Sequence, residues 1–394
     1  MGKLWKGTLL IAGTTIGGGV LGLPVLTSLG GFFPAVILYL VCWLFMMITG
    51  LLTIEAYFWN EGDPNLISMA KNTIGTWGKI YTWLIYIFLF YCLTLAYTVG
   101  CGHIFNSMLG ESVPSWVGPV IFVLIFAPFV FAGARVVGVL NIPLMAGLLF
   151  FYGAFVVIGL PYVNLENLKY YDWTHSIKAL PIAFAAFGFH GTVPTLCRYL
   201  DRNVSHARFA VIAGTFIALL SYIVWEWLIL GIIPTFGPGG LAEAIEKGQT
   251  AVEPLKQHTD HPFIYPIGQG FAFFALVTSF LGVTLGLRDF LADGLGIQKT
   301  AQGRFWICVM MYVPTLFLSI TYPNIFLEAL DHAGGIGGAL LLGLLPIMMV
   351  WYGRYVRHYS SPRAVFGGKA LLILLALFVL FELSWEFAHI FGLR

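Results

Sequence analysis

Long apolar runs separated by short polar gaps fill almost the whole chain. A helix that crosses a membrane needs about 20 mostly apolar residues, and runs of about this length occur eleven times. The predicted spans are residues 7–30, 33–56, 79–103, 115–134, 138–160, 176–199, 207–231, 263–287, 304–323, 333–353 and 368–391. The pattern therefore predicts an all-α membrane protein with 11 transmembrane helices.

Positive charges are distributed unevenly between the two sides of this arrangement. Of the 20 lysines and arginines, 15 fall on one side and 5 on the other. A missed or added span would exchange the sides of all later loops and reduce this difference. The positive-inside rule then predicts a cytoplasmic N-terminus and an external C-terminus.

Two loops, 57–78 and 232–262, are longer than the others. They occupy the same place in two successive five-helix units, on opposite faces, as an inverted repeat requires. We expect both loops to be partly helical, because residues 240–247 contain good helix formers. The chain is predicted to form a single transmembrane transporter domain, 1–394, with a first repeat at about 7–160, a second at about 176–353 and an additional helix at about 368–391.

The composition agrees with a membrane protein. Hydrophobic residues make up 59% of the chain and charged residues only 10%, whereas a soluble domain carries roughly a quarter charged residues. The net charge of +2 is too small to indicate nucleic acid as a partner. The five cysteines lack paired spacing, so we expect packing residues and neither a disulfide framework nor a metal site. The short basic start lacks a clear cleavage site and is interpreted as leading into the first span.

Glycine-rich motifs interrupt the first and sixth predicted spans. The first is GTTIGGGVLGLP at residues 13–24, and the second is FGFHGTVP at residues 187–194. Each glycine costs about 1 kcal/mol in a helix interior, and proline about 3 kcal/mol. Unwound backbone is tolerated inside a membrane only where it is buried in protein or lines a wet cavity. Both helices are therefore predicted to be unwound at mid-membrane.

Such breaks expose backbone groups that can bind a charged solute. Free N–H groups at a helix start hold a carboxylate, and free C=O groups at a helix end hold an ammonium group or a cation. A zwitterionic amino acid offers both charges. Alternatively, the glycines only permit close helix packing, since Gly13/Gly17 and Gly18/Gly22 match the GxxxG pattern. The paired placement in both repeats favours the transporter interpretation.

The stretch from Ala12 to Gly19 with Pro24, and the stretch from Phe187 to Pro194, resemble the hydroxy and aromatic amino acid permeases of bacteria, most of all the tyrosine-specific permeases. The tryptophan permeases are similar. This resemblance implies membership of the amino acid–polyamine–organocation superfamily, the leucine-transporter-type 5+5 inverted repeat and symport of an aromatic amino acid with protons. Gly18 stands where the pattern has alanine, which leaves more room at the break and bears on the choice of substrate.

Recognition of an aromatic side chain requires a flat apolar slot with one or two polar groups. Phe187 and Phe189 flank the second break, while Tyr91, Thr94 and Tyr97 lie near the middle of the third span, although each could equally be a packing residue. The expected substrate-binding residues are Thr14, Thr15, Gly17, Gly18, Gly19, Tyr91, Thr94, Tyr97, Phe187, Gly188, Phe189, His190 and Gly191.

Two ionisable residues are candidates for proton coupling. His190 lies mid-span beside the second break, and a histidine side chain normally titrates near pH 6.5. It could instead be a neutral residue that stabilises the break. Glu226 lies in the outer third of the seventh span, where it is either a proton carrier or, as the flanking Trp225 and Trp227 favour, an interfacial residue within an aromatic belt.

Thr278 and Ser279 in the eighth span form a candidate cation site. These hydroxyls could bind sodium opposite the first span, or bond back to their own helix, which is commoner. Glu55 and Glu382 are interpreted as structural residues.

The sequence thus predicts a transporter of the bacterial inner membrane that imports tyrosine first, and tryptophan or phenylalanine next, with protons. Sodium coupling is the main alternative. A channel is less consistent with paired breaks, and an enzyme would need clustered catalytic groups, which are not visible. We expect no cofactor and no resident metal; the partners are substrate, protons or sodium, and lipid.

Overall fold

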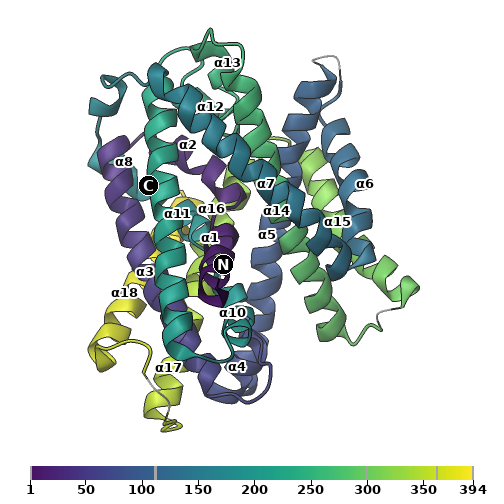
Figure 1. Ribbon diagram of the computed structural model, residues 1–394, viewed down its shortest axis with the longest axis vertical. Coiled ribbons are helices and arrows are strands. Elements are labelled where there is room, and N and C mark those ends of the chain that lie inside the picture. Colours follow the sequence, from purple (N-terminus) through teal and green to yellow (C-terminus); the bar gives the residue numbers. More distant parts are fainter. Residues whose placement is uncertain (1, 111–112, 299, 361–362, 393–394) are drawn as a thin grey trace.

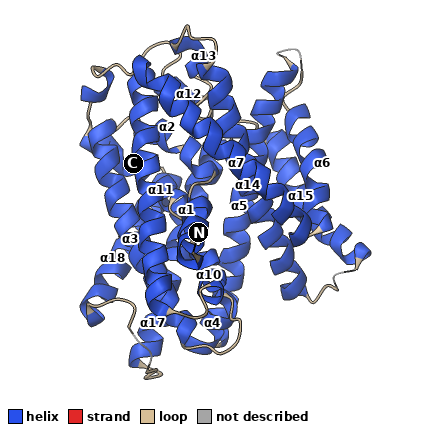
Figure 2. Ribbon diagram, viewed as in Figure 1, coloured by secondary structure: helices blue, strands red, loops and turns tan. Residues whose placement is uncertain are grey.

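The computed structural model describes residues 2–110, 113–298, 300–360 and 363–392, and this part of the chain is helical without any strand (Figures 1 and 2). Nine of its helices are long and apolar enough to cross a membrane, and ten if the bent pair at the N-terminus counts as one span. The helix that matches the fourth predicted span, Val117–Ala132, has only 16 residues. The count of eleven spans stays a prediction.

The first half of the chain contains α1 (Lys3–Thr15), η1 (Gly18–Leu21), α2 (Leu23–Thr27), α3 (Phe32–Phe58), α4 (Leu66–Thr73), α5 (Thr76–Leu109), α6 (Val117–Ala132) and α7 (Ala134–Gly159). Short turns η2 (Leu160–Tyr162) and η3 (Asn167–Lys169) connect the first half to the second half, whose elements follow. This half contains α8 (Trp173–Ser176), η4 (Ile177–Ala179), α9 (Leu180–Ala186), η5 (His190–Thr192), α10 (Val193–Tyr199), α11 (Val204–Ile232), α12 (Leu241–Glu246), α13 (Leu255–His258), α14 (Ile264–Leu295), α15 (Ala301–Thr321), α16 (Phe326–His332), η6 (Ala333–Leu344) and α17 (Leu345–Tyr355), followed by α18 (Gly368–Ile390).

Both glycine motifs coincide with interruptions of helical structure. Helix α1 ends at Thr15, and the chain resumes as η1 and α2 with a bend of 47°. Helix α9 ends at Ala186, and helical structure resumes at His190. The position of these breaks at mid-membrane follows only from the predicted topology.

The broken helices occupy the middle of the bundle (Figure 1). Helix α1 packs on α11, and α9 packs on η6. Helix α14 contacts both α7 and α5, so long unbroken helices surround the breaks. Helices α6 and α15 lie toward one edge of the view, and α18 lies toward the opposite edge.

Both long loops contain helices, as expected. Helix α4 lies in the first loop, and α12 and α13 lie in the second. The second loop packs against the broken span, because α12 contacts α2 and the Ala251 N–H donates to Leu21 O at 3.0 Å.

Candidate functional site

A cavity of about 700 Å³ lies where the two breaks meet. Its walls come from α1, α5, α7, α14 and η6 together with the break segments. The size suits a small organic solute, since such sites usually measure about 300–1,000 Å³. Aromatic rings of Tyr86, Phe90, Tyr97 and Phe189 line it, so an apolar, flat ligand finds complementary surfaces.

Most of the predicted site residues reach this cavity. They come from both breaks, from α5 and from α14. The predicted residues that line it are Thr14, Thr15, Gly17, Gly19, Tyr97, Gly188, Phe189, His190, Gly191, Thr278 and Ser279.

Five predicted residues lie elsewhere: Gly18, Tyr91, Thr94, Phe187 and Glu226. Tyr91 donates its hydroxyl hydrogen to Met310 O of α15 at 2.7 Å, and Thr94 bonds back to Phe90 O. The cavity-lining residues of α5 are 86, 89, 90, 93 and 97, which form one helical stripe. Tyr91 and Thr94 fall outside that stripe.

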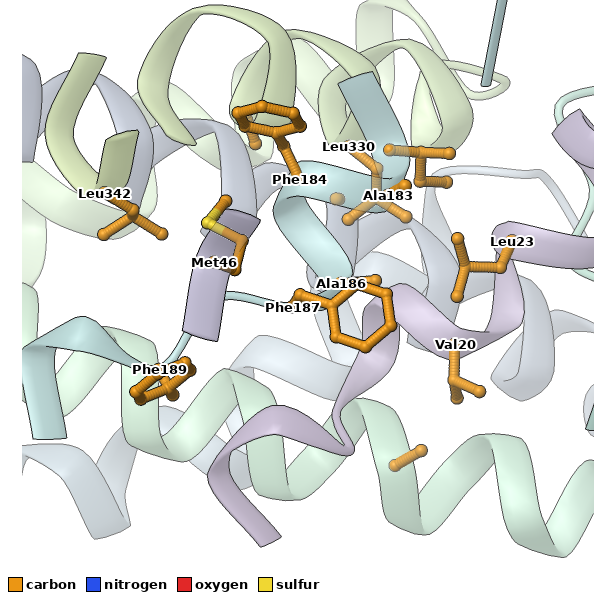
Figure 3. Close-up of a cluster of buried hydrophobic side chains, with 14 of the residues drawn as sticks. Val20, Leu23, Met46, Ala183, Phe184, Ala186, Phe187, Phe189, Leu330 and Leu342 are labelled. Carbon is orange, nitrogen blue, oxygen red and sulfur yellow. The ribbon is translucent and has the colours of Figure 1, made fainter. Parts of the chain in front are cut away.

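Phe187 turns toward a buried apolar cluster. Figure 3 shows the Phe187 ring next to the η1–α2 segment, whereas Phe189 lies farther away, at the other end of the non-helical link. The ring centroid of Phe187 is 5.0 Å from that of Tyr222. Phe187 therefore packs in the protein core beside the second break, whereas Phe189 lines the cavity.

The first break is packed tightly against α14 and α5. The Gly18 N–H donates to Ser279 Oγ at 2.9 Å, so this amide already has a side-chain partner. A Cβ on Gly17 would lie 2.7 Å from Ser279 Oγ, and a Cβ on Gly18 would lie 2.6 Å from Tyr97 Cε1. Close approach of the neighbouring helices thus requires glycine here, so the packing role of these glycines coexists with a break.

A single hydroxyl connects the two breaks. Tyr222 OH of α11 lies 2.6 Å from Thr15 O and 2.8 Å from Ala186 O. These carbonyls end α1 and α9, where helix carbonyls lack partners within the helix. Tyr222 was not predicted from sequence, since nothing in its neighbourhood distinguishes it from a packing residue.

His190 offers an unpaired ring nitrogen beside the cavity. Its Nε2 is 2.9 Å from Thr49 Oγ1, and its Nδ1 is buried without a hydrogen-bond partner. The ring stacks on Phe189 with centroids 4.7 Å apart. Whichever tautomer forms, Nδ1 remains a polar atom in need of a partner.

Glu226 is fully buried, so its interpretation as an interfacial residue of an aromatic belt is wrong. Its carboxyl group lies 2.5 Å from Thr27 Oγ1 of α2 and 2.6 Å from Tyr39 OH of α3. This burial could not be predicted from the sequence, because the flanking tryptophans suggest an interface and the inward face of α11 is determined by its packing on α2 and α3.

The two hydroxyls of α14 differ in their surroundings. Thr278 bonds back to Phe274 O at 2.8 Å, the commoner of the two fates considered for it. Ser279 instead contacts the first break. Sequence reasoning also missed Asn141 and Met145 of α7, which line the cavity; the asparagine within an apolar span was a usable signal.

The cavity opens at one end of the molecule. Its lining includes the exposed residues Lys6, Thr14 and Gly191, and a neighbouring hollow of about 270 Å³ shares Leu66 with it. Toward the other end, Gly22 packs against Ile182 and Leu327. By the predicted topology, the open end is cytoplasmic.

Comparisons with known proteins agree with this architecture. The family model for the "Tryptophan/tyrosine permease family" matches residues 1–385. The "Tyrosine-specific transport system 1" of Haemophilus influenzae is 33% identical, with 98% of this chain and 97% of that protein covered. The "Tryptophan-specific transport protein" of Pseudomonas aeruginosa is 29% identical, with 95% of this chain and 92% of that protein covered.

A solved structure supports the fold. The crystal structure of MhsT in complex with L-phenylalanine matches with a TM-score of 0.65 and 14% identity, covering 97% of each chain. The leucine-transporter-type fold is thereby confirmed. Together, the helices, the cavity between the breaks and these matches show that the chain is an integral membrane transporter, rather than an enzyme, and that it belongs to the tryptophan/tyrosine permease family.

Proposed function

We propose that the protein imports an aromatic amino acid, tyrosine first and tryptophan or phenylalanine next, together with protons. The observation that carries this proposal is the cavity between the two breaks, because backbone segments at the helix breaks and aromatic side chains line the same space. The names of the relatives, tyrosine-specific and tryptophan-specific, support the substrate class. We place the protein in the bacterial inner membrane, with the N-terminus cytoplasmic and the C-terminus external.

In this proposal, the break segments hold the charged end of the substrate. The first break, with Gly17 and Gly19 in the cavity wall, receives the carboxylate on backbone N–H groups other than that of Gly18, which already bonds Ser279. The ends of α1 and α9 attract the ammonium group. The substrate ring then lies among Tyr97, Phe189 and Phe90, beside His190.

Glu226 is proposed as a proton carrier, with His190 as a second proton site. The Thr27 hydroxyl lies within bonding distance of both Leu23 O, at 2.7 Å, and Glu226. It has one hydrogen to donate. If this hydrogen goes to Leu23 O, a protonated Glu226 donates to Thr27; if it goes to Glu226, the carboxylate accepts from both Thr27 and Tyr39. The network therefore accommodates both protonation states.

Transport would proceed by alternating access. Glu226 joins α2, α3 and α11, so its protonation acts on the segments that flank the first break. The state with an open cytoplasmic end would release substrate, and the core of spans 1, 2, 6 and 7 would rock against the rest to open the other end. The single-domain organisation of residues 1–394 is part of the same proposal.

Uptake into proteoliposomes tests substrate and coupling together. Labelled tyrosine is supplied outside, and a pH gradient and a sodium gradient are imposed separately. We expect accumulation with the pH gradient alone, and competition by tryptophan and phenylalanine. Accumulation with sodium alone would instead favour the sodium-coupled alternative, with Ser279 and Thr278 at the cation site. Uptake of no aromatic amino acid would reject the proposal.

A further inference from the structure

A compact group of ionisable side chains lies between α16 and α18, away from the cavity. Asp331 and His332 end α16, and Glu382 and Glu386 lie one turn apart on α18. Glu382 and Glu386 are only 0% and 1% exposed. None of the four lines the cavity, so the substrate site does not explain them.

The geometry of this group resembles a set of metal ligands. His332 Nδ1 lies 2.7 Å from Glu386 Oε1, and one donor atom from each of Asp331, His332 and Glu386 lies within 4.8 Å of the others. Zinc binds nitrogen and carboxylate oxygen at about 2.0–2.2 Å. In the tetrahedral geometry of zinc, ligand atoms on one ion lie about 3.3–3.6 Å apart. Binding therefore requires the His332–Glu386 hydrogen bond to lengthen while the three donor atoms gather around the ion.

The charges of the group are not balanced by protein. Three carboxyl groups meet one histidine, and in the described part of the chain no lysine or arginine forms an ion pair with them. Both oxygens of Glu382 and Oδ1 of Asp331 are buried without a hydrogen-bond partner. Buried charges are normally paired or bound to metals, because an uncompensated buried carboxylate is costly.

The packing holds this group together and leaves one side accessible. A Cβ on Gly335 would lie 2.8 Å from Glu386 Cδ, so glycine lets α18 approach η6 closely. The side chain of His332 is 40% exposed, which provides an entry route for an ion.

We propose that Asp331, His332 and Glu386 bind one divalent transition-metal cation of the zinc type, with Glu382 as an adjacent carboxylate. An imidazole among the ligands selects zinc, cobalt or nickel over magnesium and calcium. Three protein ligands leave a coordination position for water, to which Glu382 can hydrogen-bond. The bound ion joins α16 to α18 and stabilises the last helix against the bundle, independently of the substrate.

Cobalt binding to the purified full-length chain tests this site. The protein is kept in detergent, freed of any affinity tag and metal, and titrated with Co²⁺ while visible absorption and melting temperature are recorded. We expect one equivalent to bind and the melting temperature to rise, because a ligand of the folded state stabilises it. His332→Gln and Glu386→Gln should each weaken binding at least tenfold, a loss of about 1.4 kcal/mol.

His389→Gln provides the matched control, since His389 is an exposed histidine on the last turn of α18. This variant should bind cobalt like the unaltered protein. Absence of binding by the unaltered protein, or equal binding by both site variants, would overturn the proposal. If Glu386→Gln fails to fold, His332→Gln decides alone, because its side chain is partly exposed. Tyrosine uptake is a separate measurement, so failure of the metal site and failure of the proposed function are distinguishable.

Discussion

The ring of Tyr97 packs directly on the backbone of Gly18. A Cβ at residue 18 would lie 2.6 Å from Tyr97 Cε1, well inside the normal carbon–carbon contact of about 3.5–4.0 Å. Tyr97 lines the cavity, so the absence of a methyl group at residue 18 sets the position of one cavity wall. Glycine at residue 18 therefore lets the Tyr97 ring approach the break more closely than alanine would.

Replacing Gly18 with alanine should narrow the cavity. The methyl group displaces the Tyr97 ring into the substrate space, and we expect the KM for tyrosine to rise about tenfold, or about 1.4 kcal/mol. Kinetics of labelled tyrosine uptake measure this. Gly18→Ala combined with Tyr97→Leu should recover part of the loss. Gly138→Ala is the control, since its Cβ meets nothing within 4 Å; an unchanged KM in Gly18→Ala would contradict the argument.

Removing the Tyr222 hydroxyl should loosen both breaks. Tyr222→Phe leaves Thr15 O and Ala186 O without this donor, which costs about 1–3 kcal/mol of unfolding free energy. Thermal melting in detergent measures the loss, and uptake should fall strongly. Tyr152→Phe removes a comparable hydroxyl-to-carbonyl bond, to Ser221 O at 2.9 Å, and should destabilise without abolishing uptake. Equal uptake losses in the two variants would show that the Tyr222 hydrogen bond to the breaks has no specific role in transport.

Glu226→Gln should separate binding from coupling. Glutamine retains hydrogen bonds to Thr27 and Tyr39 but cannot release a proton. We expect exchange of labelled for unlabelled tyrosine to persist, while accumulation driven by a pH gradient is lost. Glu243→Gln, at a partly exposed carboxylate paired with Lys247, serves as control. Full pH-driven accumulation by Glu226→Gln would remove Glu226 from the coupling step.

His190→Gln tests the second proton site. Glutamine can still bond Thr49, but it no longer offers the unpaired ring nitrogen next to the cavity. The expected result is a higher KM for tyrosine together with a weaker response to the pH gradient. Unchanged pH-driven uptake would leave His190 as a structural residue of the break.

The buried pair of Glu55 and Arg354 predicts a stability effect outside the cavity. Arg354 Nε and one of its terminal nitrogens each lie 2.6 Å from a Glu55 oxygen, and both side chains are at most 5% exposed. Arg354→Met leaves a buried carboxylate uncompensated, which costs about 3–5 kcal/mol. Adding Glu55→Met should restore most of the melting temperature. No recovery in the double variant would mean that the pair contributes more than mutual charge compensation.

The sequence predicted the helices and both breaks because these depend on local properties. Runs of apolar residues have the length of a span, and clustered glycines weaken a helix locally, although the glycines of η6 lie within a continuous helical span. The face of α5 that lines the cavity was harder to predict from the sequence. Tyr91, Thr94 and Tyr97 lie on the same helix, but only Tyr97 belongs to the cavity-lining stripe with residues 86, 90 and 93. The neighbours that select the stripe are distant in sequence.

The burial of polar residues was the other feature that could not be predicted from the sequence. Glu226 and Tyr222 lie on the inward side of α11, yet their partners Thr27, Tyr39 and Thr15 come from spans 1 and 2. Such long-range bonds arise only when the two repeats pack together. Asn141 is a milder case, since a lone amide in an apolar span already indicates a polar neighbour or cavity.

The shared hydroxyl of Tyr222 has a kinetic consequence for the transport cycle. In the proposed proton-coupled cycle, two broken helices that moved separately would create partly open intermediates through which protons could leak without substrate. The Tyr222 hydroxyl has one hydrogen, which the two helix-end carbonyls share, so a state in which only one end has shifted loses part of this bond. The two breaks are then expected to move together, so that the proposed cycle does not dissipate the energy of the proton gradient.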